Sequence, residues 1–82
     1  MKIEELASIL NEYYAIGKKR RECNSLVQCF GIKYGNLIIE NNFRPEDIVN
    51  NSILNGTTYA TEIRKGIKLS NYVVLKDGIK LP

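Results

Sequence analysis

The stretch PEDIVNNSILNGTTYATEIRKG, residues 45–66, decides how the chain folds. Pro45 suits the first position of a helix, and the two carboxylates after it lie in the first turn, where negative charge favours the helix dipole. The Asn-Gly pair is a turn signal, and the threonines that follow it can cap a new helix. We therefore expect a short helix over 45–53 and a second helix over 58–65 that ends at Gly66.

The apolar residues of this stretch fall where two helices joined by a turn would pack together. Ile48 and Val49 give the first helix its apolar side, and Leu54 is the hydrophobic residue of the turn. Tyr59 and Ile63, four positions apart, direct one face of the second helix into the core. This arrangement resembles the helix-turn-helix motif, and the resemblance implies a second helix that enters the major groove of DNA.

The outward face of the second helix is polar. Its threonines and cations recur at helical spacing on the side opposite the apolar residues. Short hydroxyls can hydrogen-bond to base edges or phosphates, and cations can neutralise phosphates. The resemblance therefore assigns nucleic-acid contacts to Thr57, Thr58 and Thr61 near the bases, to Arg64, Lys65 and Lys68 on the phosphates, and to Lys18, Lys19, Arg20 and Arg21 on the flanking backbone.

Strand-forming residues follow the second helix. Tyr72 to Leu75 are aromatic, β-branched or apolar, Asp77-Gly78 is a favoured two-residue hairpin turn, and residues 79–81 would form the returning strand. The order of helices followed by a hairpin resembles the topology of winged-helix domains. We therefore expect a mostly α fold with a small C-terminal β-hairpin, in which residues 1–82 form one winged-helix-like domain.

The N-terminal half is predicted to be helical, with one part left open. Residues 3–16 carry an apolar stripe at helical spacing, and Gly17 follows as a C-terminal cap, just before the basic run KKRR. In residues 22–41, apolar side chains at helical spacing favour a helix that is broken or bent near Gly31. The two short apolar runs of this segment are also compatible with strands.

Composition bounds the class of protein. The chain has 82 residues, 44% of them hydrophobic and 26% charged, which is typical of one small globular domain, and we expect it to be a module of a longer protein. It has neither an apolar run of membrane-spanning length nor a signal-peptide layout, so we expect a cytoplasmic protein. Cys23 and Cys29 are its only cysteines, and we expect both to be reduced.

The sequence predicts no catalytic or cofactor site. The lack of histidine removes the commonest general base near neutral pH and, with only two cysteines, argues against zinc. The glycines form no phosphate-binding loop, and the adjacent carboxylates at Glu4-Glu5 are explained by the first turn of a helix. We therefore expect no enzyme activity, metal, cofactor or small-molecule substrate in this chain alone, which is also compatible with an accessory domain of a larger enzyme.

Two functional classes remain. A net charge of +3 and a pI near 9.0 are compatible with a DNA-binding targeting or regulatory module whose partner is double-stranded DNA. The alternative is a protein-interaction or dimerisation domain without nucleic-acid binding, because a basic face is often only a solvated face. In that alternative, aromatic side chains supply the docking surface, namely Tyr13, Tyr14, Phe30 and Tyr34.

Overall fold

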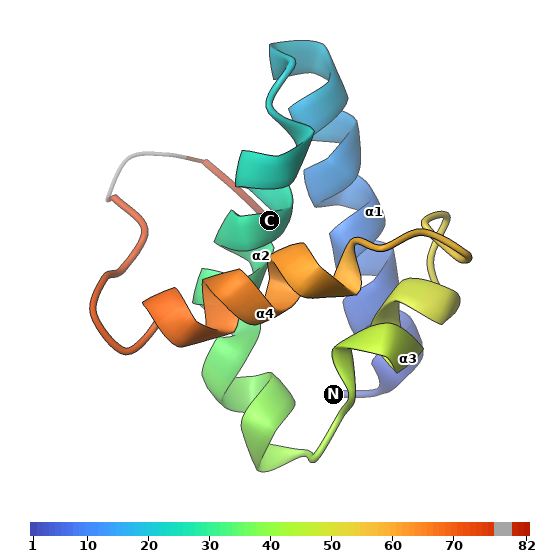
Figure 1. The fold of residues 1–82 in the computed structure, drawn as a ribbon, viewed down its shortest axis with the longest axis vertical. Helices are drawn as coiled ribbons and strands as arrows, with labels where there is room; N and C mark the ends of the chain where they lie inside the picture. Colours follow the sequence, from blue (N-terminus) through green and yellow to red (C-terminus); the bar gives the residue numbers. More distant parts are fainter. Residues whose placement is uncertain (77–79) are drawn as a thin grey trace.

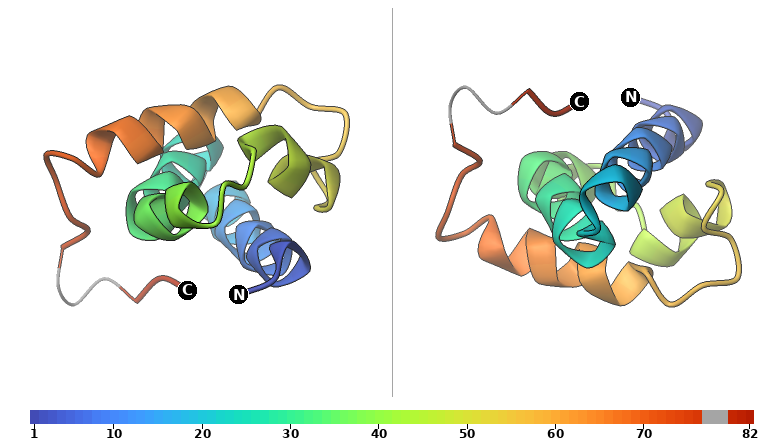
Figure 2. Two further views of the ribbon diagram at one scale, coloured as in Figure 1. Left: turned by 90° about the horizontal axis from the view of Figure 1, so that it is seen from below. Right: turned by 90° about the horizontal axis from the view of Figure 1, so that it is seen from above.

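The computed structural model describes residues 1–76 and 80–82, and four helices account for all of their regular secondary structure (Figure 1). The helices are α1 (Ile3–Arg20), α2 (Cys23–Glu40), α3 (Pro45–Asn50) and α4 (Ala60–Leu69). α1 and α2 form an antiparallel hairpin, α4 crosses α2, and α3 packs against α1 and α4. Figure 2 shows that α4 lies on one side of the α1–α2 pair and that both chain termini lie on the other.

α1 is longer than the sequence predicts. Leu6, Leu10 and Tyr13 are buried along its apolar stripe, but the helix continues through Gly17 and ends when Arg21 adopts the left-handed conformation at φ 57°. The prediction that Gly17 caps the helix is therefore wrong. A Cβ atom at Gly17 would lie 2.8 Å from Cys23 Cα, so this glycine lets the start of α2 pack directly against α1.

α2 is one unbroken helix, so neither the predicted break near Gly31 nor the alternative strands occur. Gly31 is buried where α2 crosses α4: an added Cβ atom would lie 2.5 Å from the carbonyl oxygen of Ile63 and 2.9 Å from Gly66 Cα. Gly66, predicted to end the last helix, instead lies inside α4 at the same crossing. These glycines bring the two helix backbones into contact, and that packing outweighs their poor helix propensity.

The helix-turn-helix segment has shifted boundaries. α3 ends at Asn50 rather than near 53, and α4 occupies 60–69 rather than 58–65, so the connector is longer than a standard tight turn. Leu54 is buried in the connector, as predicted, and Gly56 takes φ 84°. The Asn11 side chain on α1 accepts a hydrogen bond of 2.9 Å from the backbone N–H of Ile53, which ties the connector to α1.

The predicted C-terminal wing is absent: the described residues after α4 contain no strand. The backbone N–H groups of Tyr72 and Val73 donate to the carbonyl oxygen of Leu69, which extends the end of α4 as a turn. An isolated two-stranded hairpin is marginal in water, and residues 1–76 and 80–82 form no sheet edge that would support one. The chain instead returns to the helices, where the Tyr34 hydroxyl donates to the Pro82 carbonyl at 2.6 Å. The predicted Asp77-Gly78 turn lies outside the described residues.

The core joins all four helices. Its buried apolar residues include Ile38 from α2, Ile48 and Val49 from α3, and Ile63 from α4. Tyr13 and Phe30 meet edge to face in its centre, with ring centroids 5.7 Å apart. None of the helices in the described part of the chain has the length and apolar character needed to cross a membrane.

Candidate nucleic-acid interface

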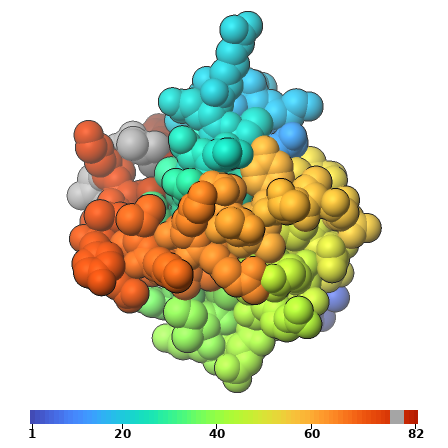
Figure 3. All heavy atoms as spheres, in the orientation of Figure 1, coloured from blue at the N-terminus to red at the C-terminus, as the bar shows by residue number. Residues whose placement is uncertain are grey.

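The polar face of α4 is exposed on the side of the molecule seen in Figure 3. Ile63 and Ala60 bury the opposite face of the helix against the core. The predicted contact residues of this region are all exposed: Thr57 and Thr58 in the connector before α4, and Thr61, Arg64, Lys65 and Lys68 on the helix itself. Thr61, Arg64 and Lys68 therefore share the exposed face of α4, as their helical spacing predicts, while Thr57 and Thr58 lie in the connector before it.

The start of α4 differs from the prediction. Tyr59, rather than a threonine, is the N-cap residue, and no side chain caps the helix there. Thr57 Oγ1 accepts a long hydrogen bond of 3.4 Å from the Tyr59 backbone N–H. Thr58 has its side chain exposed beside the first turn. The threonine hydroxyls are thus positioned around a helix N-terminus, where backbone N–H groups and the helix dipole favour negatively charged groups.

Arg64 is engaged within the molecule. Its Nη2 atom donates to Glu46 Oε1 at 2.6 Å, and Nη1 forms a second contact with Oε2 of the same carboxylate. Glu46 belongs to the first turn of α3, so this bidentate pair joins the two helices of the motif. The hydrogen bond from Arg64 is the main reason that the pKa of the Glu46 carboxyl falls to about 2.

Lys65 also has a carboxylate partner. Its Nζ atom lies 3.3 Å from Glu62 Oε2, and the other oxygen of Glu62 accepts a hydrogen bond of 2.7 Å from Gln28 Nε2 on α2. The Gln28 hydrogen bond, followed by that of Lys65, lowers the pKa of Glu62. Lys68 takes part in none of the ion pairs found among the described residues. The positive charge of α4 is therefore largely balanced before any ligand arrives.

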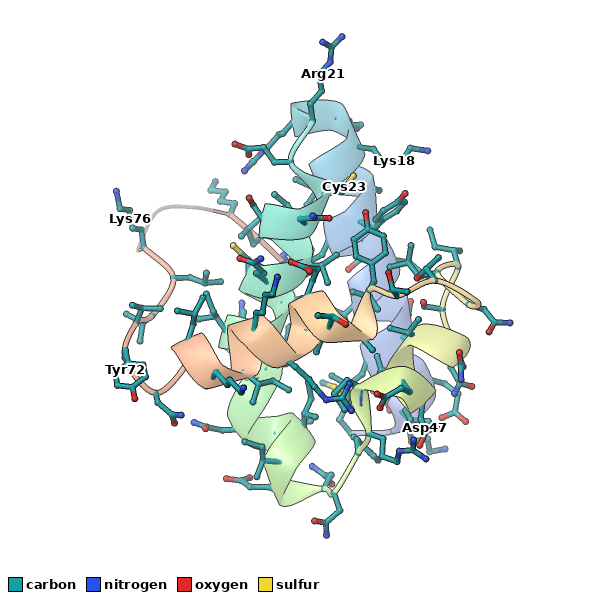
Figure 4. All side chains as sticks on the ribbon, in the orientation of Figure 1. Lys18, Arg21, Cys23, Asp47, Tyr72 and Lys76 are labelled. Carbon is teal, nitrogen blue, oxygen red and sulfur yellow. The ribbon has the colours of Figure 1, made fainter. Side chains whose placement is uncertain are left out.

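The basic run 18–21 forms the tip of the α1–α2 hairpin, and we call it the basic tip. Lys18, Lys19 and Arg20 make the last turn of α1, Arg21 follows, and all four side chains are exposed. None of them forms an ion pair with another described residue. Figure 4 shows Arg21 extending from the end of the hairpin. The basic tip thus carries four consecutive cations, none of which has an ion-pair partner among the described residues.

Aromatic contacts place Lys18 of the basic tip near the start of α4. Lys18 Nζ lies 6.0 Å from the ring centroid of Tyr14, at the outer limit for a cation–π contact. The Tyr14 ring meets that of Tyr59 edge to face at 5.6 Å. Because Tyr59 caps α4, Lys18 lies on the N-terminal side of that helix (Figure 4). Lys18 of the basic tip therefore lies near Tyr59 at the start of α4, although the two are far apart in the sequence.

The sequence prediction missed the polar residues of α2 at this surface. Asn24 joins Thr58, Tyr59 and Glu62 in lining a small hollow between α2 and α4. Asn24 and Gln28 precede Gly31 and Gly35 on one helical stripe, at i, i+4, i+7 and i+11, which is the side of α2 that faces α4. This signal was present in the sequence, but it requires an unbroken α2.

The fold and this surface define a helical module of the helix-turn-helix type. Residues 2–76 match the model of a protein family described as "HTH-like domain", and the chain belongs to that family. The predicted resemblance to helix-turn-helix domains is therefore confirmed. Neither the curated proteins nor the solved structures include a significant match to the chain.

Among the described residues, no group of three or more metal-ligating side chains is close enough to hold a metal ion. Cys23 and Cys29 are both free thiols and lie half-buried on α2. Burial is the main cause that raises the pKa of the Cys29 thiol, and the nearby Glu22 carboxylate adds to it. A raised thiol pKa disfavours the reactive thiolate at neutral pH.

Proposed function

We propose that this chain is a DNA-binding module that targets or regulates a larger assembly, and that it binds double-stranded DNA without catalysing a reaction. The observation that carries the proposal is the adjacency of α4 and the basic tip through the Lys18–Tyr14–Tyr59 contacts. It brings Lys18 near Tyr59, which directly follows the exposed Thr57 and Thr58. Membership of the HTH-like domain family supports the same function.

The two parts of the surface would have different tasks. The threonines before and within α4, namely Thr57, Thr58 and Thr61, have the short hydroxyls that read base edges. The basic tip would hold the flanking phosphates, which position a protein on DNA but carry no sequence information. Because Arg64 and Lys65 are already paired with Glu46 and Glu62, we expect the basic tip to supply more of the affinity than these two cations.

The salt dependence of duplex binding tests this division. Each lost phosphate contact should flatten the plot of log affinity against log salt by about 0.9. We expect the double variant K18A/K19A to flatten it by about 1.8 on every duplex sequence, measured by fluorescence anisotropy of labelled DNA. Thr61→Ala should leave the slope unchanged and reduce the preference between duplex sequences.

The chain offers a matched control for the loss of charge. Lys2 precedes α1, and Lys33 lies on the side of α2 turned away from the Gly31–Gly35 stripe. The double variant K2A/K33A removes the same charge as K18A/K19A but should barely change the slope. Equal slopes for the two double variants, or no duplex binding by the wild-type protein at low salt, would contradict the proposal.

A second function, protein interaction, is favoured by a different surface from the one predicted. Tyr13 and Phe30 are fully buried in the core, so they cannot supply a docking surface. Beyond α4, however, Tyr72 is 85% exposed and Val74 is 87% exposed. Contiguous exposed apolar patches mark interaction sites, and these two exposed side chains are only two residues apart in the sequence. If Tyr72→Ser shifts the protein from a self-associated form to a monomer in sedimentation, this second function gains support over DNA binding.

A further inference from the structure

We propose that Glu46 is an intramolecular competitor for DNA phosphate, which holds Arg64 and limits sequence-independent binding by α4. This inference rests on the proposed function, because it assigns a regulatory role at the same surface. Glu46 would lower the affinity for every duplex sequence, and a phosphate of a well-docked duplex would displace it from the guanidinium of Arg64.

The geometry of the pair supports this role. Both terminal nitrogens of Arg64 face the two oxygens of Glu46, which is the fork-like arrangement that Arg also uses for phosphate. Two oxygens of a DNA phosphate would therefore bind the same edge of the guanidinium that Glu46 occupies. The carboxylate imitates the ligand, and the two cannot bind that edge together.

The packing of the helices keeps the carboxylate in place. Glu46 follows the buried Pro45 at the start of α3, and Arg64 follows the buried Ile63 on α4. Glu46 and Arg64 are therefore each held at a backbone position next to a residue that is fixed in the core. Arg44 Nε is also 3.9 Å from Glu46, so the carboxylate has a second cation nearby after Arg64 is released.

The pair is nevertheless open to exchange. The side chains of Arg64 and Glu46 are 47% and 37% exposed, so solvent and ligand can reach them. Exposed pairs of this kind are weak, because water and salt screen them. Protonation of Glu46 does not release Arg64 at physiological pH, because a pKa of about 2 keeps the carboxylate ionised there. A DNA phosphate is therefore the competitor that we expect to open the pair.

The test compares two variants of adjacent carboxylates on α3. Glu46→Gln should raise affinity for duplexes of any sequence and steepen the salt slope by about 0.9, because Arg64 becomes free to contact a phosphate. Asp47→Asn removes the same charge one residue away without freeing Arg64, and should leave the slope unchanged. Glu46→Asp keeps the charge but shortens the side chain. A steeper slope for Glu46→Asp would therefore come from the release of Arg64 and not from a change in net charge.

The double variant E46Q/R64A tests whether Glu46 acts through Arg64. If Glu46 acts through Arg64, the gain from Glu46→Gln should vanish in the Arg64→Ala background. A gain that survives there, or a Glu46→Gln slope equal to that of Asp47→Asn, overturns the inference while leaving the proposed function standing. A wild-type protein that binds no duplex at low salt overturns both.

Discussion

At the scale of single residues, the crossing of α2 and α4 depends on glycine. Replacing a helical Gly with Ala ordinarily stabilises a helix by roughly 1 kcal/mol. At Gly31 the new Cβ atom would meet the carbonyl oxygen of Ile63 at 2.5 Å, and that backbone atom can move only if α4 shifts. We therefore expect Gly31→Ala to reduce the free energy of unfolding by roughly 1–3 kcal/mol, measured by urea denaturation.

Gly35→Ala is the control for that prediction. Its Cβ atom would lie 3.0 Å from Ser70 Oγ, the end of a side chain that can rotate away if it gives up its hydrogen bond to the Ile67 carbonyl oxygen, and the helix propensity gained offsets that loss. We expect Gly35→Ala to be nearly neutral or stabilising. If Gly31→Ala were as stable as Gly35→Ala, the close approach of the two helix backbones would not be a feature of the folded protein in solution.

Ile63 was predicted to be a core residue, and the structure confirms that it is fully buried. Ile63→Ala should cost about 2–5 kcal/mol of unfolding free energy, because it removes buried methyl groups and leaves a cavity. Ile53 in the connector is 65% exposed, so Ile53→Ala should change stability by less than about 0.5 kcal/mol. Similar unfolding midpoints for the two variants would contradict the assigned register of α4.

At the scale of elements, local signals predicted the helices better than their ends. The apolar spacing of Ile48, Val49 and Ile63 identified α3 and α4, because those residues do face the core. Gly17 and Gly66 were misread as helix ends, because a glycine that allows close packing has the same sequence signal as one that ends a helix. The difference lies in tertiary contacts, which a local pattern does not contain.

The candidate site was predictable to a similar degree. Helical spacing on α4 correctly indicated that Thr61, Arg64 and Lys68 are exposed. It gave no sign that Glu46 would pair with Arg64, since this contact depends on how α3 and α4 pack. The wing was wrongly predicted because the strand propensity of residues 72–75 is realised only when another strand or a sheet edge is available.

The connector between α3 and α4 gives a prediction at this scale. Asn11 Oδ1 accepts from the Ile53 backbone N–H, a bond between α1 and a segment that has no regular secondary structure. We expect Asn11→Ala to cost roughly 0.5–1.5 kcal/mol and to speed hydrogen exchange at Ile53. Exchange at Ile38 inside α2 should be affected only through global stability. Unchanged exchange at Ile53 would mean that Asn11 does not fix the connector.

At the scale of the whole molecule, charge is arranged unevenly although the net charge is only +3. α4 pairs two of its cations with Glu46 and Glu62, while the basic tip has no carboxylate within ion-pair distance among the described residues. Long-range attraction to a polyanion should therefore be directed by the tip of the α1–α2 hairpin. The paired cations of α4 would become available only at short range, after the domain has docked.

The same two carboxylates predict how stability depends on acid. Glu46 and Glu62 have folded-state pKa values below the usual 4.5, about 2 for Glu46, because Arg64 and Gln28 respectively donate to their ionised forms. A depressed pKa contributes stability that is fully present above the ordinary pKa and is lost as pH falls through the folded-state value. The melting temperature should therefore stay level down to about pH 5 and fall between there and about pH 2.

Variants separate this effect from the general repulsion among positive charges at low pH. The double variant E46Q/E62Q should have a lower melting temperature than the wild type at neutral pH. Its melting temperature should fall less on acidification, because the side chains at these two positions no longer take up protons. Glu4→Gln removes a carboxylate that forms no ion pair with the described residues, and should show the full wild-type loss. Melting curves recorded by circular dichroism from about pH 7 to pH 2 measure both quantities. If E46Q/E62Q lost as much stability as the wild type over that range, the pairs that join α4 to α3 and α2 would not contribute to folding in solution.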